Sequence, residues 1–139
     1  MQPLLVGVAS GAGAFSSLFE AARAAGVRVG WLDLDSRDPQ PSDLGGAATA
    51  GAMRSVGVAG RTTVAVKQLS GDPVLRDLVR EHFTGCRLVL VRGKIEAPQL
   101  HPAAGDWRLQ RTAVEEGELL STEALLTALR SPCFPDRDA

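Results

Sequence analysis

A glycine-rich loop near the amino terminus is the segment whose residues point most directly to chemistry. An apolar run over residues 3–9 ends in Ser10-Gly11-Ala12-Gly13-Ala14, and an amphipathic segment follows it. A glycine loop between a strand and a helix gathers backbone N–H groups at the positive end of the helix, which is an anion site in principle. The same loop is equally typical of a tight turn that binds nothing, because turns are the usual reason for glycine clusters.

Two phosphate-binding motifs compete for this loop, and the first is the P-loop. A P-loop needs a lysine for the outer phosphates and a hydroxyl for magnesium. Here those positions hold Ala14 and Phe15, and Val8 stands where the first glycine would be. Ser16 and Ser17 carry hydroxyls, but they come one and two places late. We therefore do not expect a working P-loop.

The second motif is the dinucleotide-binding pattern GxGxxG, which matches in part. Gly11 and Gly13 fit, and Ser16 replaces the third glycine. Asp33 follows Gly13 by 20 residues, at the end of the next predicted strand, where a ribose-binding acid would lie one strand over from the loop. A polar strand terminus is the plainer interpretation of Asp33 and of Asp35 beside it. One alternative is thus a small Rossmann-like domain that binds a dinucleotide or another phosphate.

Hydrophobic periodicity and turn residues predict the elements that must position the loop. In chain order we expect a strand over 3–9, a helix from Phe15 to Ala25, a strand from Val27 to Leu34, a hairpin of 55–59 with 62–67, a helix after Asp72-Pro73, strands at 87–91 and 107–109, and a helix over 122–130 capped by Ser121. This order predicts the α/β class: a three-layer, P-loop-like domain with a mainly parallel sheet and an antiparallel β-hairpin. We expect one domain over residues 1–130 and a polar tail over 131–139.

Composition agrees with a globular domain and excludes several function classes. Of 139 residues, 45% are hydrophobic and 22% charged, and the net charge is −1, so no basic excess suggests a nucleic-acid partner. No apolar run reaches the length of a membrane helix, and no basic residue precedes the amino-terminal apolar stretch as in a secretory signal. The two cysteines, Cys86 and Cys133, fit no metal-binding spacing and are typical of free thiols in a reducing compartment. We expect a cytoplasmic protein with no membrane partner.

Three segments, in this order, resemble the MobB family, the accessory proteins of molybdopterin-guanine dinucleotide biosynthesis. They are the Ser10–Gly13 opening, then Asp43 separated by six residues from Ala50-Gly51-Ala52, and then Leu88-Val89-Leu90-Val91 followed by Arg92 and Gly93. The resemblance spans about residues 3–130. It implies a small P-loop GTP-binding fold with a hairpin after the AGA segment, a homodimer, and a role beside the guanylyltransferase that acts on molybdopterin.

All departures from the family pattern lie at positions that would bind or process the nucleotide. Ala14 and Phe15 replace the P-loop lysine and threonine, Arg92 replaces the glutamate expected near magnesium or water, and the lysine expected at Ile95 is found one place early, at Lys94. Phosphoryl transfer depends on positioning and charge stabilisation, so these losses predict weakened GTP and magnesium binding and no hydrolysis. We expect no catalytic residues, and a scaffold or regulatory role. The candidate binding residues are Ser10, Gly11, Ala12, Gly13, Ser16, Ser17, Asp33, Asp43 and Arg92.

Arg92 is the one departure that could restore anion binding, because a guanidinium at a strand end near the loop could hold a phosphate in place of the lost lysine. The plainer interpretation is a solvent-facing arginine. The histidines, His82 and His101, have no matched ligands, so we expect no metal site. An interaction module without a small ligand is the remaining alternative. Whichever function holds, the exposed edge of the predicted hairpin at 55–67 favours pairing with a second copy of the chain.

Overall fold

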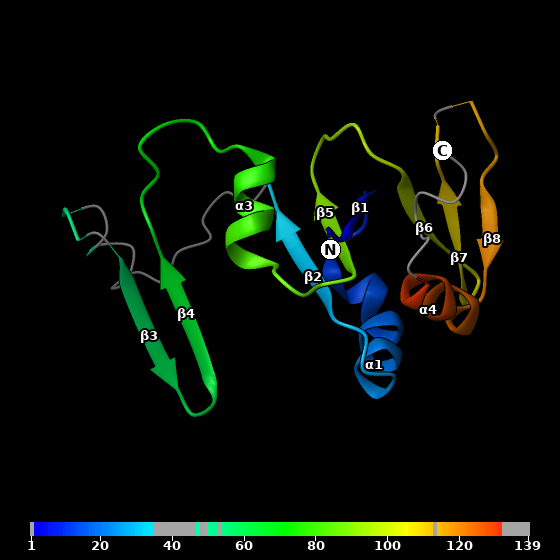
Figure 1. The fold of residues 1–139 in the computed structure, drawn as a ribbon, viewed down its shortest axis with the longest axis horizontal. Helices are drawn as coiled ribbons and strands as arrows, with labels where there is room; N and C mark the ends of the chain where they lie inside the picture. Colours follow the sequence, from blue (N-terminus) through cyan, green and yellow to red (C-terminus); the bar gives the residue numbers. More distant parts are fainter. Residues whose placement is uncertain (1, 35–46, 48–49, 53, 113, 132–139) are drawn as a thin grey trace. The chain divides into compact units, whose positions relative to one another are not determined.

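The computed structural model describes residues 2–34, 47, 50–52, 54–112 and 114–131 (Figure 1). The chain divides into two compact units, one formed by Met1–Asp35 with Val79–Ala139 and one by Ser36–Leu78. The prediction of one domain over 1–130 with a tail over 131–139 stays a prediction. Residues 132–139, among them Cys133, lie outside the described part.

The larger unit is built on a six-stranded sheet in the order β2-β5-β1-β6-β7-β8. The strands are β1 (Leu4–Val8), β2 (Val29–Asp33), β5 (Leu88–Arg92), β6 (Gln99–Ala103), β7 (Asp106–Gln110) and β8 (Glu118–Leu120). The first four in the sheet run parallel, and β7 and β8 continue it antiparallel. This mixed, mainly parallel sheet confirms the predicted α/β class.

One face of this sheet carries the main hydrophobic core. The 3-10 helix η1 (Ala12–Phe15) leads into α1 (Ser16–Ala24), and α4 (Thr122–Arg130) lies beside α1 (Figure 1). Alternate residues of the central strands, such as Val6, Leu88 and Leu90, are fully buried in the same cluster as the apolar side chains of the two helices. The sheet thus buries one side against α1 and α4, as the helical periodicity of both segments requires.

The other face of the sheet has small residues at its centre. Gly30 pairs in register with Val89, and Gly7 pairs with Val91. The ring of Phe83 lies directly over Gly30, at 2.4 Å from where a Cβ would be. Phe83 follows α3 (Leu75–His82), a helix whose first four residues belong to the smaller unit. Both Val89 and Val91 are fully buried, so this face is also covered at its centre.

The smaller unit contains the antiparallel hairpin of β3 (Ser55–Ala59) and β4 (Thr62–Val66). Its turn contains Gly60, whose φ of +59° lies in the left-handed region that favours glycine. Val56 and Val58 of the hairpin are 56% and 71% exposed. The hairpin was predicted with bounds that differ by one residue, and it is confirmed.

Several other predicted elements are also confirmed, and the differences have local reasons. The last helix begins where expected, and the Ser121 hydroxyl accepts a hydrogen bond from the Ala124 N–H at 3.0 Å. Strands β6 and β8 were not predicted. Pro102 in β6 weakened the strand signal, yet it is accommodated because β6 pairs with β1 only at Gln99, before the proline. No helix in the described part of the chain is long and apolar enough to cross a membrane.

Candidate functional site

The carboxyl ends of the three central parallel strands meet at one edge of the sheet, beside the glycine loop. Val8, the last residue of β1, is in register with Arg92 of β5, and Arg92 is in register with Asp33 of β2. The loop follows β1 directly. The topology therefore brings Asp33, Arg92 and the glycine loop to the same edge, which is where open α/β sheets bind ligands.

The prediction that Asp33 lies one strand over from the loop is wrong. Strand β5 is inserted between β1 and β2, so Asp33 is two strands away from the strand that precedes the loop. A Rossmann domain instead places its second strand directly beside the first. The observed order separates the acid from the glycines by the width of β5. The dinucleotide interpretation of Gly11, Gly13 and Asp33 loses its geometric basis.

The glycine loop closes as a tight turn with its own hydrogen bonds. The Ala14 N–H donates to the Gly11 carbonyl at 3.1 Å, and the Ser16 N–H donates to the Gly13 carbonyl. The Ser16 hydroxyl also donates to the Gly13 carbonyl, at 2.9 Å. Two N–H groups and one hydroxyl that could bind a phosphate are thus used inside the turn. Gly11, Ala12 and Gly13 are exposed, and Ser10 is partly so.

The residue at the P-loop hydroxyl position is part of the core. Phe15 is fully buried, and its ring stacks on Trp107 with centroids 5.4 Å apart. A second, tilted contact joins it to Trp31 at 6.2 Å. Trp107 is fixed in turn, because its indole N–H donates to the Thr122 hydroxyl at 2.8 Å. The Phe15 side chain is therefore directed into the core.

Arg92 and Asp33 form an ion pair at the strand ends. The Arg92 Nη1 atom lies 3.5 Å from the Asp33 Oδ2 atom, and the two side chains are 46% and 25% exposed. The Asp33 carboxylate thus offsets part of the positive charge of Arg92 at this edge of the sheet. A guanidinium has further N–H donors beyond those facing one carboxylate, so the pair leaves Arg92 able to contact an anion.

The remaining predicted residues are Ser17 and Asp43. Ser17 is exposed on α1. Asp43, like Asp35, lies outside the described residues. Among the described residues no three His, Cys, Asp or Glu side chains are grouped closely enough to hold a metal ion. Cys86 is a free, half-buried thiol.

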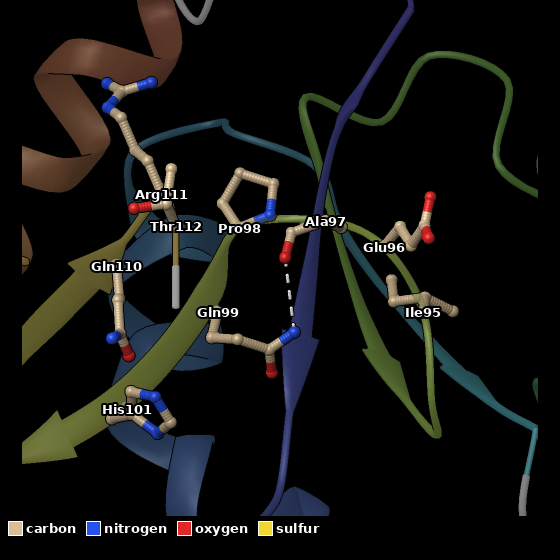
Figure 2. Close-up of a pocket in the computed structure, with 9 residues that line it drawn as sticks. All are labelled: Ile95, Glu96, Ala97, Pro98, Gln99, His101, Gln110, Arg111 and Thr112. Atoms are coloured by element: carbon tan, nitrogen blue, oxygen red, sulfur yellow. Dashed lines mark hydrogen bonds between the residues drawn. The ribbon is translucent and has the colours of Figure 1, made fainter. Parts of the chain in front are cut away.

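A polar hollow that sequence reasoning missed lies on the β6–β7 side of the sheet. It has a volume of about 800 Å³, and Gln99, His101 and Gln110 of these two strands line it. Figure 2 shows the Gln99 amide turned toward β1, with its Nε2 donating to the Ala97 carbonyl at 3.2 Å. The Gln99 amide packs over Gly7, which has no Cβ to oppose it. No sequence motif indicates this hollow, because Gln99 and His101 come from β6, a strand that was not predicted, and only the fold brings them beside Gln110.

Fold and site together define an α/β domain with a mainly parallel sheet, in which the glycine loop precedes a buried aromatic residue. No family model matches the chain, and no curated protein matches it. Among solved structures, a molybdopterin-guanine biosynthesis protein B (MobB) is similar with 17% identity and a TM-score of 0.49, over 65% of this chain and 60% of that one. A MobB from Bacillus subtilis gives 17% identity and a TM-score of 0.47, over 69% and 65% of the two chains.

A second structure of Bacillus subtilis MobB gives 18% identity and a TM-score of 0.46, over 70% of this chain and 61% of that one. This chain thus covers less than two thirds of each of these three proteins. The strand order and register of this chain define its fold without these comparisons.

Proposed function

We propose that this chain is a MobB-like accessory protein of molybdenum cofactor biosynthesis that acts as a scaffold or regulatory subunit and not as a GTPase. The assignment to molybdenum cofactor biosynthesis comes from the sequence motifs that resemble the MobB family. The strand order supports it, because β5, which carries the LVLV segment, lies directly beside the strand that leads into the glycine loop. That order suits a P-loop-like site better than a Rossmann one.

The burial of Phe15 is the observation that carries the non-hydrolytic part of the proposal. Magnesium in nucleotide sites is bound by oxygen ligands, and a hydroxyl after the loop commonly supplies one. Here that position holds a fully buried ring stacked on Trp107. Ala14, where the lysine would be, has no charge. The loop therefore lacks both groups that would hold a magnesium–triphosphate complex.

Arg92 is the group we propose for any anion that this edge still binds, together with Ser10, Gly11, Ala12 and Gly13. Its guanidinium lies at the end of the strand next to the loop and could form two parallel hydrogen bonds with a phosphate. Nucleotide affinity measured for Arg92→Ala tests this role, and an unchanged affinity would overturn it. Ser16, Ser17, Asp33 and Asp43 complete the proposed set, with Asp33 orienting Arg92 through their ion pair.

Calorimetric titration with GTP, with and without magnesium, tests the loss of the nucleotide site. We expect no magnesium-dependent binding by the natural chain. Ala14 is exposed, so the variant Ala14→Lys restores the charge without disturbing the core, and we expect it to gain about tenfold in GTP affinity. Micromolar, magnesium-dependent GTP binding by the natural chain would contradict the proposal.

A guanylylation assay tests the accessory role. Purified guanylyltransferase would be supplied with molybdopterin and GTP, with and without this chain. We expect the chain to raise the guanylylation rate although it hydrolyses no GTP itself. An unchanged rate at saturating concentrations of this chain would contradict the role.

The hairpin supports a second candidate, an interaction module that binds no small ligand. Val56 and Val58 are more than half exposed, and a two-stranded ribbon leaves a strand edge available for pairing. We propose a homodimer through this hairpin for either function. Light scattering at working concentration should give twice the mass of one chain, and a monomeric mass would remove the dimer.

A further inference from the structure

Three arginines from distant parts of the sequence meet at the amino edge of the sheet, at the opposite ends of the strands from the glycine loop. Arg28 precedes β2, Arg87 precedes β5, and Arg130 ends α4. Together with Gly26, Val27 and Gly85 they line a hollow of about 390 Å³. We call this the arginine hollow. No carboxylate from the described part of the chain lines it.

Two of these guanidiniums are held in place by the ends of the neighbouring helices. The Arg87 Nε–H donates to the Leu129 carbonyl at 2.7 Å, at the end of α4. An N–H of Arg130 donates to the Ala25 carbonyl, which caps α1. These bonds fix both side chains before any ligand arrives, which lowers the entropic cost of binding. Each helix end also carries about half a negative charge, which stabilises the guanidinium that lies against it.

Arg28 is the member of the group without such a support. Within the described residues its guanidinium makes no hydrogen bond or ion pair. Its Nη1 atom lies 3.0 Å from where a Cβ would stand on Gly85, whose φ is +88°. The glycine leaves space that any other residue would take from the Arg28 guanidinium. Like charges repel, so the Arg28 guanidinium is stabilised when an anion binds between it and the guanidiniums of Arg87 and Arg130.

An adjoining hollow of about 430 Å³ is lined largely by apolar residues. The two hollows share Gly26, Val27 and Arg28. The second adds Phe19, Ala22, Arg23 and Val29. A ligand that fits both would carry an anionic group and a small apolar body.

We propose that the arginine hollow binds the phosphoryl group of a small phosphate monoester, with the apolar body of the ester against Phe19 and Val29. Guanidiniums bind phosphate with paired, charge-assisted hydrogen bonds, and three of them suit a dianion better than a single carboxylate. The site is separate from the glycine loop, since the two lie at opposite ends of the same parallel strands. It therefore does not depend on the proposed function.

Titration of the full chain with inorganic phosphate and with phenyl phosphate tests this site by calorimetry. Phenyl phosphate should bind several-fold more tightly than inorganic phosphate. The variant Arg28→Gln should weaken both by about tenfold, because it removes a charge-assisted contact without touching the helix ends. The matched control Arg61→Gln removes one positive charge from an exposed turn outside the hollow, and it should change the affinity less than about twofold.

Two results would overturn the proposal. One is the absence of phosphate binding by the natural chain, and the other is an equal loss in Arg28→Gln and Arg61→Gln, which would mean attraction by net charge alone. Equal affinity for the two probes would overturn the assignment to a monoester. Circular dichroism of Arg28→Gln at the titration temperature should match that of the natural chain, which separates lost binding from lost folding.

Discussion

The ring of Phe15 stacks on the ring of Trp107, with centroids 5.4 Å apart and planes inclined by 16°. The first residue directly follows the glycine loop, and the second belongs to β7, near the far edge of the sheet. Both are almost fully buried. The contact ties the amino-terminal loop to the antiparallel part of the sheet. Phe15 therefore anchors the end of the loop in the core, whereas residues 11–14 of the loop are exposed.

Replacing Phe15 should therefore cost more stability than any change in the exposed loop. Phe15→Ala is expected to lower the free energy of unfolding by about 3–5 kcal/mol, since it removes a fully buried ring and leaves a cavity. Urea denaturation followed by Trp fluorescence measures the change. Val114→Ala is the control, because Val114 is 93% exposed and its truncation should cost less than about 0.5 kcal/mol. A loss of less than 1 kcal/mol for Phe15→Ala would show that the ring is not packed as described.

The close approach of Phe83 to Gly30 predicts that a single methyl group is harmful there. In Gly30→Ala the new Cβ would lie 2.4 Å from the Phe83 ring, so ring or strand must move, at a cost of about 1–3 kcal/mol. Thermal unfolding of the variant gives the measurement. Gly71→Ala is the matched control, because a Cβ at that position meets nothing within 4 Å. Equal melting temperatures of the two variants would contradict the contact.

The cap of α4 predicts a smaller and more specific effect. Ser121→Ala removes the acceptor of the Ala124 N–H and should lower the free energy of unfolding by about 1 kcal/mol. Ser121→Asp keeps an acceptor and should retain most of the stability. Chemical denaturation of both variants would decide, and equal losses would mean that the hydroxyl does not act as a cap.

The ion pair between Arg92 and Asp33 should contribute little to stability. Its atoms are 3.5 Å apart and both side chains are partly exposed, so Asp33→Asn should change the free energy of unfolding by less than about 1 kcal/mol. Added salt should shrink that difference further. A loss well above 1 kcal/mol that persists in high salt would assign Asp33 a structural role instead.

Cys86 predicts a dependence on alkaline pH. Burial raises the pKa of its thiol above the ordinary value, and the positive charge of Arg28 partly opposes that shift. The native state therefore keeps its proton longer than the unfolded state does. The resulting stabilisation is complete below the unfolded pKa and is lost as the pH rises through the native one.

Alkylation of Cys86 with iodoacetamide, in a Cys133→Ser background, measures this pKa. The reaction should be slow near neutral pH and accelerate only at alkaline pH, since the thiolate is the reactive form. Arg28→Gln should move the rate profile to still higher pH. A profile that moves to lower pH would contradict the stated balance of burial and charge.

Local signals explain why much of the fold could be predicted. The continuous apolar runs of β1 and β5, the Gly60-Arg61 turn of the hairpin and the Ser121 cap each act over a few residues, and each was predicted. The helical spacing of Phe15, Leu18, Phe19 and Ala22 also indicated one apolar face. The ring partner of Phe15 could not be predicted, because it comes from a strand more than 90 residues away.

Long-range pairing explains most of what was missed. Nothing in the sequence says that β5 enters the sheet between β1 and β2, and that insertion decides which residues face the glycine loop. Arg92 and Asp33 were predicted at strand ends, but their contact depends on the same insertion. Arg28, Arg87 and Arg130 form no motif, since only folding brings them together.

The glycines opposite Val89 and Val91 have a consequence for how this sequence can evolve. Phe83 lies where a side chain on Gly30 would be, and the Gln99 amide lies where one on Gly7 would be. The space available to each glycine and to the side chain packed over it is therefore fixed as a sum. Among related chains, we expect a larger residue at position 30 to occur with a smaller one at 83, and the same exchange between positions 7 and 99.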